Sequence, residues 1–144
     1  MSQLKPRQLD IMQNLAKMLG EKGPVKITTS LLAAECDITE AAIYRHFPSK
    51  KKIYSGLVDF CEKNIFDLIN SINSAEGDEL EKVKKILVLL VTFSEKNPGL
   101  ARLLTREAFS VDETSLDERI KQMMAKVELL IKQNLQKYEQ ETKK

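Results

Sequence analysis

Apolar residues recur at the three- and four-residue spacing of an α-helix along nearly the whole of this 144-residue chain. The first such stripe contains five residues: Leu9, Ile11, Leu15, Met18 and Leu19. Only five glycines and four prolines interrupt the pattern, and no segment alternates apolar and polar residues as a half-buried strand does. The sequence therefore predicts an all-α fold with about seven helices.

Capping and helix-breaking residues divide this pattern into segments. Thr28, Thr39 and Ser49 each precede a helical stretch and are good N-cap residues. The pairs Asp78/Glu81 and Ser115/Glu118 have the spacing of a capping box, and Asn97 precedes a proline that suits a first helical turn. We expect helices at about 6–20, 29–36, 40–47, 50–71, 79–96, 98–110 and 115–138.

The fifth predicted helix differs from the others because it is apolar on nearly all sides between Ile86 and Val91. A helix without a polar face is usually enclosed by its neighbours. We therefore expect this helix to lie at the centre of the molecule.

Charge is distributed unevenly along the chain, although the net charge is only +2. Residues 1–52 carry nine basic and five acidic side chains, whereas residues 53–144 carry fourteen and sixteen. A basic N-terminal part indicates a polyanionic partner there. We expect a DNA-binding head at residues 1–52 and a helical body at residues 53–144.

Several classes of protein are excluded by composition. The two cysteines, Cys36 and Cys61, lack the spacing of a zinc site or a disulfide framework. No apolar run is long enough for a membrane span, and the polar N-terminus does not resemble a secretory signal. His46 is the only histidine, so neither a metal site nor a catalytic triad is indicated. We expect a cytoplasmic protein that is not an enzyme and needs no cofactor.

Residues 27–50 read ITTSLLAAECDITEAAIYRHFPSK, which is two short helices joined by a tight turn. This is the spacing of a helix-turn-helix motif. Small Ala33 and Ala34 let the two helices approach each other, and Ala41 and Ala42 leave a face that fits a major groove. Thr28 stands at a helix N-terminus, which attracts phosphate. A plain helical hairpin with a solvated lysine run is the other interpretation of the same residues.

The motif resembles the N-terminal domain of TetR-family repressors at Thr28, Ala33, Ile38-Thr39, Ile43-Tyr44, Phe47 and Lys50. This resemblance implies that Tyr44 and Lys50 contact DNA phosphates and that the face from Glu40 to Arg45 meets base edges. The family's turn glycine is Asp37 here, at a position that is often left-handed. The candidate DNA-binding residues are Thr28, Thr29, Thr39, Glu40, Ala41, Ala42, Tyr44, Arg45, His46, Lys50 and Lys51.

The strings EAAIYRHFPSK and NPGLARLLT, with the helix around Arg119-Ile120, are similar to the nucleoid-occlusion members of the TetR family. This resemblance implies a homodimer that binds palindromic chromosomal DNA, and a surface that takes the acidic, hydrophobic tail of the division protein FtsZ. That surface would contain four residues: Phe60, Leu89, Lys96 and Asn97. Taken singly, Phe60 and Leu89 are better explained as core residues, and Asn97 as a helix cap.

Such relatives continue with two final helices that pack across the dimer axis, whereas this sequence stops at Lys144. We expect a naturally short form, a fragment, or a dimer formed through the last helix. Two other functions stay open: a TetR-type repressor controlled by a small ligand inside the body, and a shortened protein-interaction module with weak DNA binding. An interior cavity with converging polar groups would favour the ligand-controlled repressor over a surface groove.

Overall fold

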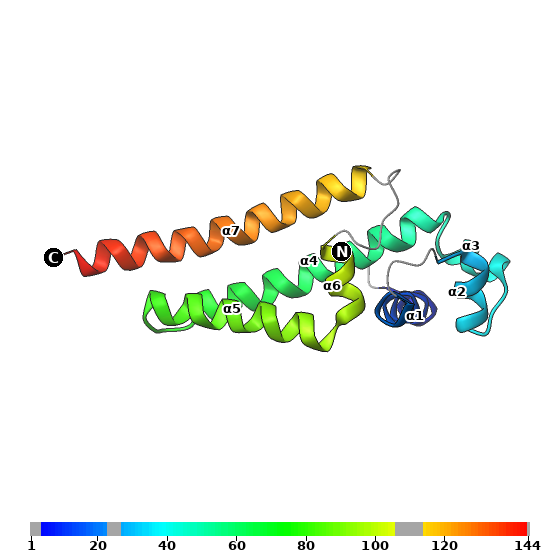
Figure 1. The fold of residues 1–144 in the computed structure, drawn as a ribbon, viewed down its shortest axis with the longest axis horizontal. Coiled ribbons are helices and arrows are strands. Elements are labelled where there is room, and N and C mark those ends of the chain that lie inside the picture. The colour runs from blue at the N-terminus through cyan, green and yellow to red at the C-terminus, as the bar shows by residue number, and fades with distance from the viewer. Residues whose placement is uncertain (1–3, 23–26, 106–113, 144) are drawn as a thin grey trace.

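The computed structural model describes residues 4–22, 27–105 and 114–143, which form seven α-helices and no strand (Figure 1). The predicted all-α fold is therefore confirmed. The helices are α1 (Pro6–Lys22), α2 (Thr29–Glu35), α3 (Glu40–His46), α4 (Lys50–Ser74), α5 (Glu79–Lys96), α6 (Pro98–Leu104) and α7 (Thr114–Thr142). In Figure 1, α1–α3 form a head at one end, and α4, α5 and α7 extend away from it.

Threonine or serine side chains cap the N-termini of α2, α3 and α4. The side-chain oxygens of Thr28, Thr39 and Ser49 accept hydrogen bonds from the backbone N–H of the third residue of α2, α3 and α4, respectively. Between α2 and α3, Asp37 adopts φ 56°, which confirms the left-handed turn position expected there. Asp tolerates this conformation better than most residues with a Cβ.

One hydrophobic core joins the head to the body. It combines Ile11 and Leu15 of α1 with Ile43 of α3, Ile53 of α4 and Leu103 of α6, all of them almost completely buried. The core therefore extends across the predicted boundary between head and body after residue 52. That domain boundary stays a prediction. Because these residues share one close-packed interior, α1 and α3 are held directly on α4 and α6.

The helices α1 and α6 approach each other closely. A Cβ at Gly99 would lie 1.8 Å from the carbonyl oxygen of Ala16, so only glycine fits at that position. Arg102 of α6 donates a hydrogen bond from Nη1 to the carbonyl oxygen of Leu19 (3.2 Å) near the C-terminal end of α1. Backbone contact and this bond together fix α6 on the head.

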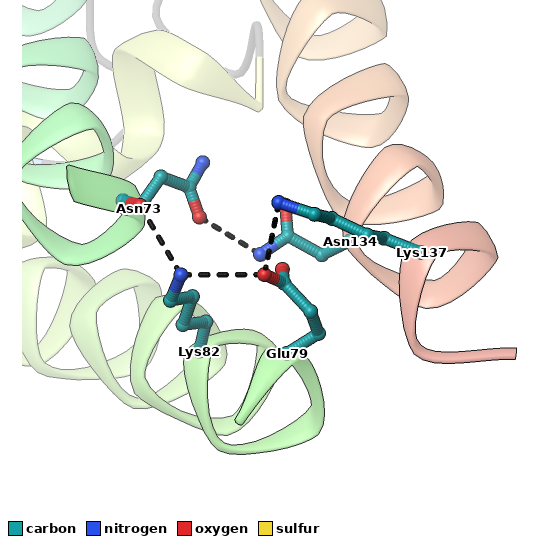
Figure 2. Close-up of polar contacts among 5 residues, drawn as sticks. All are labelled: Asn73, Glu79, Lys82, Asn134 and Lys137. Atoms are coloured by element: carbon teal, nitrogen blue, oxygen red, sulfur yellow. Dashed lines mark hydrogen bonds and ion pairs between the residues drawn. The ribbon is translucent and has the colours of Figure 1, made fainter. Parts of the chain in front are cut away.

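A second core cluster holds α7 on α4 and α5 through Ile69, Ile86, Met123 and Val127. Its outer end carries a polar cluster of five residues, shown in Figure 2: Asn73, Glu79, Lys82, Asn134 and Lys137. Oε1 of Glu79 lies 3.3 Å from Nζ of Lys82 and 3.4 Å from Nζ of Lys137. Asn134 of α7 donates to Oδ1 of Asn73 at 2.8 Å. The cluster ties α7 to both helices of the α4–α5 hairpin.

The prediction that the fifth helix is central was wrong. Val83 and Ile86 of α5 are buried, but Leu87, Val88 and Val91 are 49%, 63% and 57% exposed. The helix packs by one face on α4 and α7, and apolar residues also cover its opposite face. Apolar residues on all sides of a helix allow every face to be buried, but they do not show that every face is buried.

Several finer predictions also need correction. The fourth helix ends at Ser74 rather than near Ser71, and Thr114 already belongs to α7, so Ser115 is not its N-cap. Asp78 and Asn97 occupy N-cap positions but make no side-chain cap bond. The described part of α6 ends at Leu104, and the end predicted near residue 110 lies outside the described residues.

Candidate nucleic-acid interface and partner pocket

A side-chain hydrogen bond joins the N-terminal end of α2 to the C-terminal half of α3. The hydroxyl of Tyr44, which is 46% exposed, donates to Oγ1 of Thr29 at 3.3 Å. Thr28 and Thr39 are exposed and use their oxygens as caps, which leaves their hydroxyl hydrogens able to donate to an anion. Thr28 can therefore donate to a phosphate at the N-terminus of α2, and Thr39 can do so at the N-terminus of α3.

The face of α3 that was predicted to meet bases is open to solvent. Arg45 is exposed on this face, and a guanidinium can bind a base edge with two hydrogen bonds. Ala42 is half-buried. His46 is also half-buried, and its carbonyl oxygen accepts a hydrogen bond from Gln8 of α1. The remaining predicted residues of this face, Glu40 and Ala41, are exposed.

Three lysines occupy the first turn of α4, next to its Ser49 cap. Lys51 and Lys52 are exposed, and the ammonium of Lys50 lies 5.8 Å from the centre of the Tyr54 ring. Cations are unfavourable at a helix N-terminus because the positive end of the helix dipole is there. A bound phosphate reverses this penalty, so the arrangement indicates an anionic partner.

A pocket of about 500 Å³ opens where α1, α4 and the junction of α5 with α6 meet. Its apolar wall includes Met12, Leu57 and Leu100, which are buried. Its exposed charged lining residues are Lys17, Glu21 and Lys96, two cations and one anion. An apolar surface with ammonium groups beside it suits a ligand that carries both a hydrophobic side chain and a carboxylate.

The structure brings three of the four predicted FtsZ-binding residues into this pocket: Phe60, Lys96 and Asn97. Phe60 is 37% exposed. Asn97 is half-buried, and its Nδ2 donates to the carbonyl oxygen of Phe93 at 3.0 Å. Leu89 does not line the pocket, because it is half-buried against the second core cluster.

Sequence reasoning missed the wall of the pocket that α1 contributes. Leu9 was expected in the buried stripe, but it is 37% exposed and lines the pocket with Gln13 and Lys17. Helical geometry could have shown this. Successive residues are about 100° apart around the helix axis, so the two-position step from Leu9 to Ile11 is about 200°. Leu9 and Ile11 therefore lie on different faces of α1.

The other reactive side chains do not form a site. Burial raises the pKa of the Cys61 thiol to about 12, so it stays protonated and unreactive. No group of three potential metal-ligating side chains occurs within residues 4–22, 27–105 and 114–143. No described helix is long and apolar enough to cross a membrane.

Comparison with known proteins agrees with both parts of this architecture. The family model described as bacterial regulatory proteins, tetR family, matches residues 11–57. The model described as tetracyclin repressor-like, C-terminal domain, of the SlmA-like type, matches residues 77–143. A crystal structure of a TetR-family transcriptional regulator from Bordetella parapertussis has a TM-score of 0.78 at 12% identity, over 96% of this chain and 72% of that one.

Curated relatives are closer in sequence. The nucleoid occlusion factor SlmA of Aliivibrio fischeri strain MJ11 is 44% identical over 133 residues, which are 91% of this chain and 68% of that protein. SlmA of Shewanella halifaxensis is 42% identical over 129 residues, which are 90% and 66%. This chain thus spans about two thirds of the length of these relatives. It belongs to the TetR family of bacterial regulatory proteins, in the group of nucleoid occlusion factors named SlmA.

Proposed function

We propose that this protein is a nucleoid occlusion factor, which binds palindromic chromosomal DNA as a homodimer and inhibits assembly of the division ring beside that DNA by binding FtsZ. The observation that carries the proposal is the pocket in which Phe60, Lys96 and Asn97 meet, on a chain with a TetR-type head. The names of the curated relatives support it. Its place of action would be the cytoplasm, at the nucleoid.

The candidate DNA-binding residues divide into two roles. Thr28, Thr29, Tyr44, Lys50 and Lys51 would bind phosphates and so position the head on the duplex. The face of α3, with Thr39, Glu40, Ala41, Ala42 and Arg45, would enter the major groove beside them, with His46 at its end. Arg45 would carry most of the base recognition, because a guanidinium can bind guanine with two hydrogen bonds.

The pocket fits an acidic, hydrophobic peptide. An apolar peptide side chain would enter between Leu57 and Phe60, where burial of apolar surface contributes affinity. A peptide carboxylate would pair with the ammonium of Lys96. Lys17 already lies 3.4 Å from Glu35 and would contribute mainly to the local potential.

A repressor controlled by a small ligand is the second candidate, because a volume of about 500 Å³ is within the range of small-molecule pockets. The position of the pocket favours the peptide. It opens beside exposed Leu9, Phe60 and Lys96, whereas Ile69 and Ile86 fill the interior of the body. TetR-family members are DNA-binding regulators, so the proposal includes no catalytic step.

Substitution of Lys96 tests the proposal. We expect Lys96→Glu to weaken binding of a fluorescent FtsZ-tail peptide at least about tenfold, because the new carboxylate repels the acidic peptide. Lys85→Glu, on the exposed side of the same helix, is the matched control and should stay within about twofold of the wild type. Both variants should bind duplex DNA normally. Equal peptide affinities for the two variants would remove Lys96 from the site.

A further inference from the structure

The side-chain amide of Gln8 connects the beginning of α1 to the end of α3. Its Oε1 accepts a hydrogen bond from the backbone N–H of Lys5 at 3.0 Å. Its Nε2 donates to the carbonyl oxygen of His46 at 3.2 Å. The side chain is half-buried, and both ends of the amide are therefore used within the head.

The bond to His46 gives a partner to a carbonyl group at the C-terminal end of the recognition helix. The last carbonyl groups of a helix have no partner within it, and α3 has only seven residues. Among the described residues, this bond is the one hydrogen bond between α1 and α3. Its acceptor belongs to the residue that directly follows Arg45, the proposed base-reading side chain.

Helix α1, which supplies Gln8, is itself firmly held. The core residues Ile11 and Leu15 anchor α1, and Gly99 packs against its backbone. Gln8 thus links the C-terminal end of the recognition helix to the best-packed helix of the head. A small rotation of α3 would displace the tip of Arg45, because that side chain is long.

We propose that Gln8 is a positioning residue for base recognition, which holds the end of α3 so that Arg45 meets its base at the correct angle. The inference rests on the proposed DNA-binding role of α3. Two hydrogen bonds to one base need a defined direction, whereas a phosphate contact tolerates displacement. Loss of the Gln8 bond should therefore lower the preference for the specific site more than the affinity for random DNA.

Two variants separate this role from capping of α1. Gln8→Met is neutral and loses both hydrogen bonds. Gln8→Glu can still accept from the N–H of Lys5 but has no donor for His46. Gln122→Met, the same substitution at an exposed position of α7 outside both candidate surfaces, is the matched control. The probe is the duplex that the wild-type protein selects from a random library, compared with a scrambled duplex of the same composition by fluorescence anisotropy.

We expect both Gln8 variants to lower the ratio of specific to scrambled affinity by about three- to tenfold, the size of one net hydrogen bond. The ratio cancels the general repulsion that the carboxylate introduced by Gln8→Glu adds. Relative to Gln122→Met, the melting temperature should fall further in Gln8→Met than in Gln8→Glu, because only Gln8→Glu keeps the bond to Lys5. The ratio of specific to scrambled affinity should fall alike in both variants, which a purely structural role would not produce.

Three results would overturn the proposal. An unchanged ratio in both variants, or a lower ratio in Gln8→Glu alone, would show that the bond to His46 does not position α3. A lower ratio in Gln8→Met alone would assign Gln8 to capping of α1. A wild-type chain that selects no duplex would contradict base recognition by α3 itself, and with it the proposed DNA-binding function.

Discussion

At the scale of single residues, the first turn of α4 shows a conflict between stability and the proposed function. Lys50, Lys51 and Lys52 stand at the positive end of the helix dipole, where acidic residues are favoured. This first turn contains no acidic residue. An arrangement that costs stability in the free protein is understandable if a phosphate binds there.

We therefore expect Lys51→Glu to raise the free energy of unfolding by about 0.3–1 kcal/mol, because it replaces a cation by an anion at the helix N-terminus. The same change should weaken binding of specific and scrambled duplexes alike and lower the salt dependence by about one counterion per copy. Thermal unfolding and anisotropy at two salt concentrations measure both effects. Unchanged DNA binding would exclude a phosphate contact at Lys51.

Residue chemistry made several features of the head predictable from sequence. Thr28, Thr39 and Ser49 were identified as caps because their hydroxyls suit that position, and Asp37 was expected in the left-handed turn. The bond from Gln8 to His46 was not predictable. It joins residues 38 positions apart, and local sequence patterns contain no information about such a contact.

At the scale of helices, the packing of α6 on α1 depends on one glycine. A Cβ on Gly99 would overlap the carbonyl oxygen of Ala16, so the two helices would have to separate. We expect Gly99→Ala to lower the free energy of unfolding by about 1–3 kcal/mol, measured by urea denaturation.

Gly56→Ala is the control for that experiment. Its new Cβ would lie 3.4 Å from the flexible thioether sulfur of Met12, and alanine is the better helix former by up to about 1 kcal/mol. This variant should be as stable as the wild type or more stable. Equal losses in the two variants would contradict the close approach of α6 to α1.

The polar cluster that holds α7 predicts a pH dependence. Burial opposes ionisation of Glu79, but the hydrogen bond and charge of Lys82 and the charge of Lys137 outweigh it, so the pKa of this carboxyl lies below its ordinary value. The stability that the ionised group contributes is complete above the ordinary Glu pKa of about 4.3. It is lost as the pH falls through the lowered value.

We expect Glu79→Gln to melt at a lower temperature than the wild type near neutral pH, with the difference shrinking below about pH 4. Glu81→Gln, at an exposed residue that pairs with Lys84, should show little difference at any pH. The measurement is the melting temperature of all three proteins across that pH range. A constant difference between Glu79→Gln and the wild type would show that Glu79 is not ionised in the cluster.

Periodicity predicted the existence of all seven helices but not the environment of each. The spacing of apolar residues correctly separated α4 from α5, because Gly77 and its polar neighbours interrupt the pattern. The same pattern failed for α5, since Val88 and Val91 are exposed. Periodicity shows which residues can be buried, whereas burial depends on which segments lie beside them.

At the scale of the whole molecule, the two candidate surfaces are separate but share a framework. The proposed phosphate-binding end of α4 is at Lys50, and Phe60 of the pocket follows ten residues later, about 15 Å along the helix. Residues of α1 and α4 share one core cluster with α3, and both helices also line the pocket. DNA and an FtsZ tail could therefore occupy one protein at the same time.

Sedimentation velocity with two labels tests this central claim most directly. The experiment mixes the protein with its selected duplex, carrying one fluorophore, and an FtsZ-tail peptide carrying another. We predict that both labels move together in one species that contains protein, DNA and peptide. Displacement of the duplex by the peptide, or DNA-bound protein that leaves the peptide free, would contradict a protein that links chromosomal DNA to FtsZ.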